Sequence, residues 1–430
     1  MTPAARVALA VELLERIEAG GVADRETANF FRSRRFAGSK DRAAVSHQVY
    51  AVLRRRAELM WRLRGANLPV DARRLVLAEL ASTGDQDPAG VRALFDGSRF
   101  GPAALDASEQ AAIPALQAPM SGTPDWVQGA YPEWLDAALR ERFGGDVIAE
   151  MHALTARAPV DLRVNRLKGT RDDALEALAM SHIDATATPL SPVGVRLAGR
   201  AELAKQSVFT GGLVEPQDEG SQIVALLVAA KPKMQVVDLC AGAGGKTLAL
   251  AAEMQNRGQI YACDIEERRL RRVEPRLQRA GVRNVQTHVL RDGDDPLLTE
   301  LVGKADRVLI DAPCSGIGTW RRQPDARWRL TPDDLTRDRH AQAALLDRAA
   351  PLLRPGGQLV YATCSLLPSE NEDQVQRFLS RQPSFVLRPA SEVWRETLQT
   401  EPPGDSPYLR LTPLRHGTDG FFAAVLRQSG

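Results

Sequence analysis

The chain of 430 residues is too long for a single compact core, so we expect two or three domains. Its composition, with 44% hydrophobic and 26% charged residues, is typical of a globular protein, and no stretch approaches the roughly 18 apolar residues of a membrane span. The net charge is +2, and an N-terminus without the features of a signal peptide predicts a cytoplasmic protein that has no membrane partner.

The N-terminal region is predicted to be all-α with a positive surface. Apolar residues recur at helical spacing over 3–19, 24–36 and 41–64, and again over 70–81 and 88–96. Residues 1–64 contain 13 Lys/Arg and 7 Asp/Glu, whereas the rest of the chain has a net charge of −4. The positive residues gather in two runs, Arg32, Arg34, Arg35 and Arg54, Arg55, Arg56. Such a face can follow a phosphate backbone, although a solvated helix surface explains the same charges.

A stretch rich in Gly, Pro and Ala at 97–130 predicts a linker with one short helix. The pattern that follows indicates a small α+β module, with helices over 132–155 and 170–181 and strands over 160–167, 193–198 and 206–210. We therefore expect an all-α domain with its linker over 1–120 and the α+β module over 130–215.

From residue 216 onward strands and helices alternate. Strands are predicted over 235–240, 259–265, 285–290, 306–311, 358–365 and 420–426, and helices over 245–256, 266–280 and 335–353. This alternation predicts an α/β domain over 216–430 with a parallel sheet. Ligands of such sheets bind beyond the carboxyl ends of the strands.

The first of these strands leads into a loop of small residues. The loop runs through Cys240, Ala241, Gly242, Ala243, Gly244, Gly245 and Lys246. Its glycines allow a tight turn, and the helix that follows offers free N–H groups. Asp264 ends the next strand, where a carboxylate can accept hydrogen bonds from both hydroxyls of a ribose. Loop and acid together predict a cofactor that contains a nucleoside.

Two common nucleotide-binding patterns fail at one position each. A P-loop ending in Gly245-Lys246-Thr247 requires glycine at residue 240, which is Cys. The dinucleotide pattern GxGxxG starting at Gly242 requires glycine at residue 247, which is Thr. S-adenosylmethionine fits better, with Asp292 after the third strand near the adenine and Asp311 after the fourth near the reacting centre. As helix caps or turn residues, either acid would have only a structural role.

Four cysteines occur, at positions 240, 263, 314 and 364, without a CxxC pair, so we expect neither a metal site nor a disulfide framework. Cys240 and Cys263 lie in apolar strands and are expected to be buried. Cys314 follows the fourth strand and Cys364 closes the fifth. Because successive parallel strands are often neighbours about 4.8 Å apart, these two thiols are expected to face one cleft.

Thiols beside a methyl donor suggest methylation of carbon 5 of cytosine, which is too weak a nucleophile to react unaided. A thiolate that adds to carbon 6 makes carbon 5 electron-rich; carbon 5 then takes the methyl group, and loss of its proton expels the sulfur. Nearby positive charge favours the thiolate, and Lys246, Arg321 and Arg322 are candidates for it. From the residues alone, either thiol can be the nucleophile.

Several blocks resemble the Nop/Sun RNA cytosine-5 methyltransferases. The signature blocks are 237–247, 311–328 (DAPCSGIGTWRRQPDARW) and 361–372 (YATCSLLPSENE), and shorter matches lie at 162–168 (LRVNRLK), 217–222 (QDEGSQ) and 418–422 (TDGFF). The resemblance covers about 130–430. It implies a class I methyltransferase domain with a Rossmann-like sheet, an RRM-like module before it, and S-adenosylmethionine as cofactor. The N-terminal helices resemble, more loosely, the NusB-like RNA-binding domain of Sun-type ribosomal RNA enzymes.

The resemblance also implies residue roles. Cys364, in the Thr-Cys block, is the nucleophile, and Cys314, in the Pro-Cys block, assists product release. Asp311, expected near the reacting centre, can position the base by holding the exocyclic amine and ring nitrogen of the cytosine. The cofactor site comprises residues 240–246 with Asp264, Asp292 and Asp311. Two positions depart from the family pattern: Ala243 stands where proline is usual, which alters the stiffness of the loop, and Gly220 stands where alanine is usual.

We therefore expect a monomeric enzyme that methylates carbon 5 of a cytosine in RNA. The NusB-like match favours small-subunit ribosomal RNA, with tRNA as the alternative, and Arg321, Arg322 and Arg327 are candidates for phosphate contacts. The intact cysteines and glycine loop disfavour a non-catalytic RNA-binding or ribosome-assembly protein. DNA cytosine methylation is disfavoured because its attacking thiol belongs to the Pro-Cys block and it has no Thr-Cys block.

Overall fold

The computed structural model describes residues 1–199 and 201–429, which form two compact units. The first unit comprises Met1–Arg157 together with Trp320–Leu330, and the second comprises Ala158–Thr319 together with Thr331–Gly430. In the described part of the chain, no helix combines the length and the hydropathy that crossing a bilayer requires.

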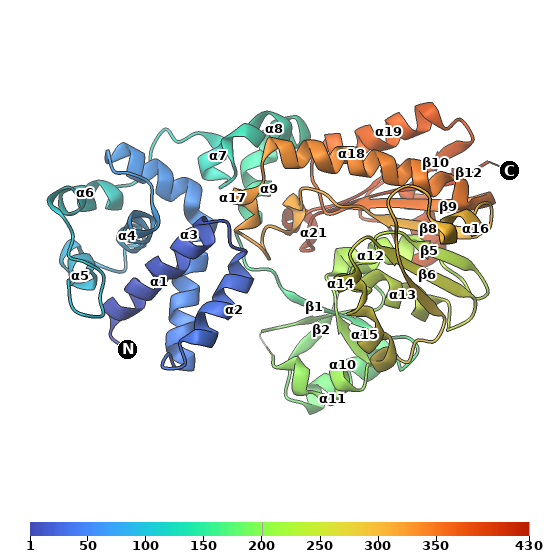
Figure 1. Ribbon diagram of the computed structural model, residues 1–430, viewed down its shortest axis with the longest axis horizontal. Coiled ribbons are helices and arrows are strands. Elements are labelled where there is room, and N and C mark those ends of the chain that lie inside the picture. Colours follow the sequence, from blue (N-terminus) through green and yellow to red (C-terminus); the bar gives the residue numbers. More distant parts are fainter. Residues whose placement is uncertain (200, 430) are drawn as a thin grey trace. The chain divides into compact units, whose positions relative to one another are not determined.

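The first unit is helical, as predicted. Its N-terminal helices are α1 (Pro3–Glu18), α2 (Ala23–Ser33), α3 (Ser39–Gly65), α4 (Ala72–Ser82) and α5 (Pro88–Leu94) (Figure 1). Their apolar faces meet in one core that includes Leu13, Leu14, Leu59 and Leu63, each fully buried. The helices α8 (Asp136–Phe143) and α9 (Val147–Ala153) complete this part.

The stretch 97–130 is more ordered than a linker. It contains α6 (Ala107–Gln117) and α7 (Asp125–Gln128). A capping box of Asp106 and Glu109 starts α6, and Ile113 and Leu116 are fully buried in the helical core. The predicted short helix is present as α6, but the stretch also contains α7 and packs into the helical core, which its Pro- and Ala-rich composition did not indicate.

The second unit begins with a small antiparallel sheet in the order β2-β3-β1-β4. Its strands are β1 (Val160–Val164), β2 (Ala185–Ala187), β3 (Gly194–Leu197) and β4 (Val214–Pro216), and α10 (Arg171–Met180) follows β1. The predicted strand over 206–210 is instead the single helical turn α11 (Ser207–Thr210), which is closed by a hydrogen bond from the Gly211 N–H to the Ser207 carbonyl.

The large sheet has the order β10-β12-β9-β8-β5-β6-β7, with β11 paired to β12. The parallel strands are β5 (Gln235–Asp238), β6 (Gln259–Asp264), β7 (Val285–Val289), β8 (Ala305–Asp311) and β9 (Leu353–Thr363), and the antiparallel ones are β10 (Phe385–Arg388), β11 (Leu409–Leu411) and β12 (Phe421–Gln428). The predicted α/β domain with a methyltransferase-like sheet is thus confirmed.

Helices cover both faces of this sheet. On one face lie α12 (Glu219–Leu227), α13 (Gly245–Glu253) and α15 (Val273–Ala280), and on the other lie α18 (Pro332–Ala349) and α19 (Glu372–Arg381) (Figure 1). The helix α20 (Ala390–Leu398) packs into the core of the first face. Alternate residues of each strand enter the two cores: Val236 faces the first and Val237 the second. The shorter helices α14 (Glu267–Leu270), α16 (Pro296–Glu300) and α21 (Pro413–His416) lie in the connections.

Candidate active site

The strand order reverses at β5, which has β6 on one side and β8 on the other. At such a switch point the loops after neighbouring strands diverge and leave a crevice for a ligand. The glycine loop follows β5, Asp264 ends β6 and Asp311 ends β8. Cys314 and Cys364 follow the adjacent strands β8 and β9. The sheet therefore brings the predicted site residues to one edge.

The glycine loop is fixed by Asp264. One carboxylate oxygen accepts a hydrogen bond from the Gly242 N–H (2.8 Å) and the other from the Glu266 N–H (2.8 Å). Gly242 has φ +55°, and a side chain built there would meet nothing within 4 Å. Gly244, with φ +82°, caps α13. A positive-φ loop with open space beside a strand-end carboxylate fits the nucleoside end of S-adenosylmethionine.

The outer side of the loop is held by arginines that the sequence did not single out as site residues. The buried guanidinium of Arg163, on β1, donates hydrogen bonds to the Gly245 carbonyl (2.6 Å) and to the side chain of Gln217. Arg276, on α15, donates to the Ala243 carbonyl and pairs with Glu215 (3.0 Å). The LRVNRLK block thus contributes to the shape of the loop, which only the fold reveals.

Lys246 and Asp311 form an ion pair between the glycine loop and the end of β8. The Lys246 Nζ lies 2.5 Å from a carboxylate oxygen of Asp311 and 5.5 Å from the centre of the Phe421 ring. Lys246 is buried, whereas the Asp311 side chain is 33% exposed. The ammonium group of Lys246, which we expected to stabilise a thiolate, is therefore paired with Asp311.

Asp292 lies in an exposed turn after β7, beyond the strand end as predicted. The neighbouring Asp295 has the structural role in this turn. It is buried, caps α16 by accepting from the N–H groups of Leu297 and Leu298, and contacts the ring of His288 (2.9 Å). These hydrogen bonds hold the pKa of Asp295 at about 2 against the opposing effect of burial. Asp292 stays available for a ligand.

The two thiols lie side by side: the Sγ atoms of Cys314 and Cys364 are 3.4 Å apart, and both residues are partly exposed. The hydrogen bond to Cys364, together with burial, raises the pKa of Cys314 well above its ordinary value. Burial likewise raises the pKa of Cys240 and of Cys263, which is fully buried as predicted. Cys240 lies in the glycine loop after β5, and Cys314 and Cys364 follow β8 and β9.

The predicted phosphate contacts of Arg321, Arg322 and Arg327 need correction. Residues 320–330, which include α17 (Ala326–Arg329), fold into the first unit. Arg327 is fully buried there and donates hydrogen bonds to the carbonyls of Ala130 (2.5 Å) and Leu154 (3.2 Å). Arg321 is also buried, at 6% exposure, and Arg322 is exposed. Arg327 is thus a structural residue, because its guanidinium satisfies buried carbonyls.

The positive runs of the N-terminal helices are only partly available to a ligand. Ion pairs with Glu12, Glu58 and Glu18 engage Arg34, Arg55 and Arg56, respectively. Arg32, Arg35 and Lys40 are exposed, and between them Phe36 exposes 71% of its surface. We call these four residues the α2–α3 basic patch.

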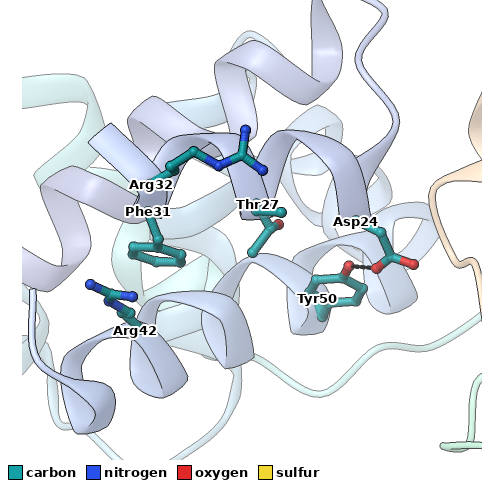
Figure 2. A pocket seen from close by; sticks show the side chains of 7 residues that line it. Asp24, Thr27, Phe31, Arg32, Arg42 and Tyr50 are labelled. Atoms are coloured by element: carbon teal, nitrogen blue, oxygen red, sulfur yellow. Dashed lines mark hydrogen bonds between the residues drawn. The ribbon is translucent and has the colours of Figure 1, made fainter. Parts of the chain in front are cut away.

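A hollow of about 520 Å³ lies between α2 and α3 beside this patch. Figure 2 shows the ring of Phe31 between the side chains of Arg32 and Arg42, and the hydroxyl of Tyr50 directed at Asp24. An open surface with cations next to aromatic rings is suited to a nucleic-acid backbone and its bases.

Comparisons with known proteins agree with this geometry. The family model described as 16S rRNA methyltransferase RsmB/F matches residues 225–427, and the ferredoxin-like domain of the same proteins matches residues 131–204. A probable ribosomal RNA small subunit methyltransferase B from Synechocystis is 36% identical over 311 residues, which is 70% of this chain and 68% of that protein.

Solved structures are similar as well. The crystal structure of PH0851 aligns over 100% of this chain and 99% of its own, with 25% identity and a TM-score of 0.78. A methyltransferase homologue from Pyrococcus horikoshii aligns over 71% of this chain and 97% of its own, with 30% identity and a TM-score of 0.60.

Proposed function

This chain belongs to the RsmB/F family of methyltransferases, and on that premise we propose that it methylates carbon 5 of a cytosine in small-subunit ribosomal RNA through a covalent adduct. S-adenosylmethionine is the cofactor and supplies an electrophilic methyl group. The observation that carries the proposal is the pair of thiols, 3.4 Å apart beside the crevice that contains Asp311.

In the proposed reaction the thiolate of Cys364 forms a bond from its sulfur to carbon 6 of the cytosine. The electron pair of the 5,6 double bond moves to carbon 5, which takes the methyl group; the bond from that methyl to the sulfonium breaks, and S-adenosylhomocysteine is the leaving group. The proton on carbon 5 then leaves to a base, the double bond re-forms, and the bond between sulfur and carbon 6 breaks. The enzyme regains its thiolate, and the product is 5-methylcytosine.

The assignment of Cys364 as nucleophile is supported by the environment of Cys314. Because the hydrogen bond to Cys364 and burial raise the pKa of Cys314, this thiol keeps its proton at neutral pH. A protonated Cys314 can donate a hydrogen bond to the sulfur of Cys364, 3.4 Å away. Cys314 then acts in the release of the methylated base.

Asp311 is proposed to hold the cytosine. Its side chain is one-third exposed, so an oxygen can meet the exocyclic amine while Lys246 fixes the carboxylate from below. The base must leave its stack to reach this position, which costs a few kcal/mol that RNA contacts must offset. The α2–α3 basic patch is a candidate for such contacts, through phosphates for its cations and stacking for Phe36.

The choice of ribosomal RNA rests on the family and on the relatives named as small subunit methyltransferases, with tRNA as the alternative. Because such a substrate would be met in the cytoplasm, we propose a cytoplasmic location.

The proposal is tested by comparing Cys364→Ala and Cys314→Ala with labelled S-adenosylmethionine and transcribed small-subunit ribosomal RNA or tRNA. We expect no methyl transfer by Cys364→Ala and a covalent RNA–protein adduct that accumulates in Cys314→Ala. Normal turnover by Cys364→Ala would exclude the mechanism. Failure of the parent protein to bind S-adenosylmethionine by calorimetry would favour a non-catalytic RNA-binding protein.

A further inference from the structure

A buried carboxylate lies directly behind the two thiols. Glu370, in a short turn before α19, is 0% exposed. One of its oxygens accepts hydrogen bonds from the Ser315 N–H (2.9 Å) and from the Gln342 amide (3.0 Å). The other accepts from the hydroxyls of Ser315 and Ser365, which also contact each other (3.1 Å). Ser315 and Ser365 each follow a site cysteine, so one side chain joins both cysteine loops.

The two loops depend on Glu370 to different degrees. The loop of Cys364 has further anchors, because Asn371 donates to the Ser365 carbonyl (3.0 Å), and the Cys364 carbonyl accepts from the Gly318 N–H (2.8 Å). The loop of Cys314 is bonded at Ser315 to Glu370 by both its N–H and its hydroxyl, and Gln342 also donates to the Pro313 carbonyl (2.9 Å). Ser315 thus gives Glu370 two hydrogen bonds and Ser365 gives it one, so loss of Glu370 removes more contacts from the loop of Cys314.

We propose that Glu370 is a positioning residue that holds Cys314 in register with Cys364 and thereby couples methyl transfer to product release. This inference rests on the proposed function, in which Cys364 attacks and Cys314 assists release. The negative charge of Glu370 also acts in the direction that raises the pKa of Cys314, which is consistent with a thiol kept protonated beside its partner.

The first test uses Glu370→Gln in the full-length protein. Glutamine keeps the size of the side chain but replaces one acceptor oxygen by an N–H donor, which opposes the donors of Ser315 or Ser365. We expect unchanged affinity for S-adenosylmethionine, because the glycine loop is not bonded to Glu370. Turnover should fall at least tenfold, and a covalent RNA adduct should accumulate as in Cys314→Ala. The adduct should vanish in the double variant Glu370→Gln, Cys364→Ala.

Glu372→Gln is the matched control. Glu372 lies two residues further on and pairs with Arg410 (2.7 Å), away from both cysteine loops, so this variant should behave as the parent protein. Ser315→Ala is a milder alternative should Glu370→Gln fold poorly, and it should accumulate less adduct. Parent-like turnover by Glu370→Gln, or absence of adduct in Glu370→Gln where Cys314→Ala forms one, would overturn the proposal.

A second readout needs no RNA. Diamide oxidises two neighbouring thiols to a disulfide and is itself reduced to the hydrazine, and mass spectrometry then counts bridged Cys314–Cys364. Positioning by Glu370 predicts fast bridging in the parent and in Glu372→Gln, and bridging several-fold slower in Glu370→Gln. Equal rates would reject the positioning role. Failure of Cys314→Ala to form an adduct alongside slowed bridging would instead reject the proposed reaction.

Discussion

Among single residues, Asp238 gives the stability of the second unit a defined pH dependence. It ends β5 and is bonded only to the Thr247 hydroxyl (2.7 Å) among the described residues. Burial raises its pKa to about 7, with the charge of Asp311 acting in the same direction. In the unfolded chain the carboxyl titrates near pH 4. Between these values the folded state holds a proton that the unfolded state has lost, so stability falls as pH rises to about 7 and then levels off.

Asp238→Asn removes this titrating carboxyl, so the free energy of unfolding should depend less on pH. We expect the free energy of unfolding of the parent to drop between pH 5 and pH 8, relative to the variant, by on the order of 2 kcal/mol. Urea denaturation at the two pH values measures the difference. An identical drop in both proteins would show that Asp238 titrates normally in the folded state.

The sequence could name the candidate site residues because each of them stands where a predicted strand ends. Cys314, Cys364 and Asp264 all follow apolar runs, and parallel topology then gathers them. The sequence could not predict the ion pair of Lys246 with Asp311 or the hydrogen bonds of Glu370 with Ser315. Both join side chains that are distant in the chain.

Among elements, β1 of the small sheet supports the glycine loop that follows β5 in the large sheet. The Arg163 guanidinium donates to the Gly245 carbonyl, and burial lowers its pKa to about 10, still well above neutrality. Arg163→Met should leave that carbonyl without its charged donor, at a cost of about 1–3 kcal/mol. We expect affinity for S-adenosylmethionine, measured by calorimetry, to weaken about tenfold or more.

Arg166→Met provides the control for this prediction. Arg166 lies in the same LRVNRLK block, but its side chain is 58% exposed and pairs with Glu253 (3.1 Å) at the surface. Surface pairs of this kind contribute little, so cofactor affinity should stay near that of the parent. If both variants lost the same affinity for S-adenosylmethionine, the positive charge of the block would be the cause and the hydrogen bond from Arg163 to the glycine loop would not.

Sequence patterns predicted the long elements of both units better than the short ones. The parallel strands β5, β6 and β8 were found because buried strands read as apolar runs, and β7 (VQTHV) was found although it is not buried. The strands β2, β4 and β11 were missed because each has only three residues, too few for a periodic signal, and β10, with four residues, was missed as well.

At the scale of the whole molecule, the segment 320–330 makes the first unit discontinuous in sequence. It leaves the second unit after Thr319, packs into the helical unit and returns at Thr331. Within the helical unit, Trp328 donates to the Leu53 carbonyl (2.7 Å) and Asp325 accepts from the Ala23 N–H (3.1 Å). No local pattern reveals such an insertion, because its partners lie up to about 300 residues away.

Arg327→Met tests how much the helical unit depends on this segment. The change removes the two hydrogen bonds to the Ala130 and Leu154 carbonyls and leaves both buried oxygens unpaired, which should destabilise the unit by about 2–4 kcal/mol. Thermal unfolding should show a lower transition temperature for the variant. Arg329→Met is the control, because Arg329 is 38% exposed in its pair with Asp325, and it should cost about 1 kcal/mol or less. Equal transition temperatures for the parent and Arg327→Met would mean that the inserted segment does not stabilise the helical unit through this arginine.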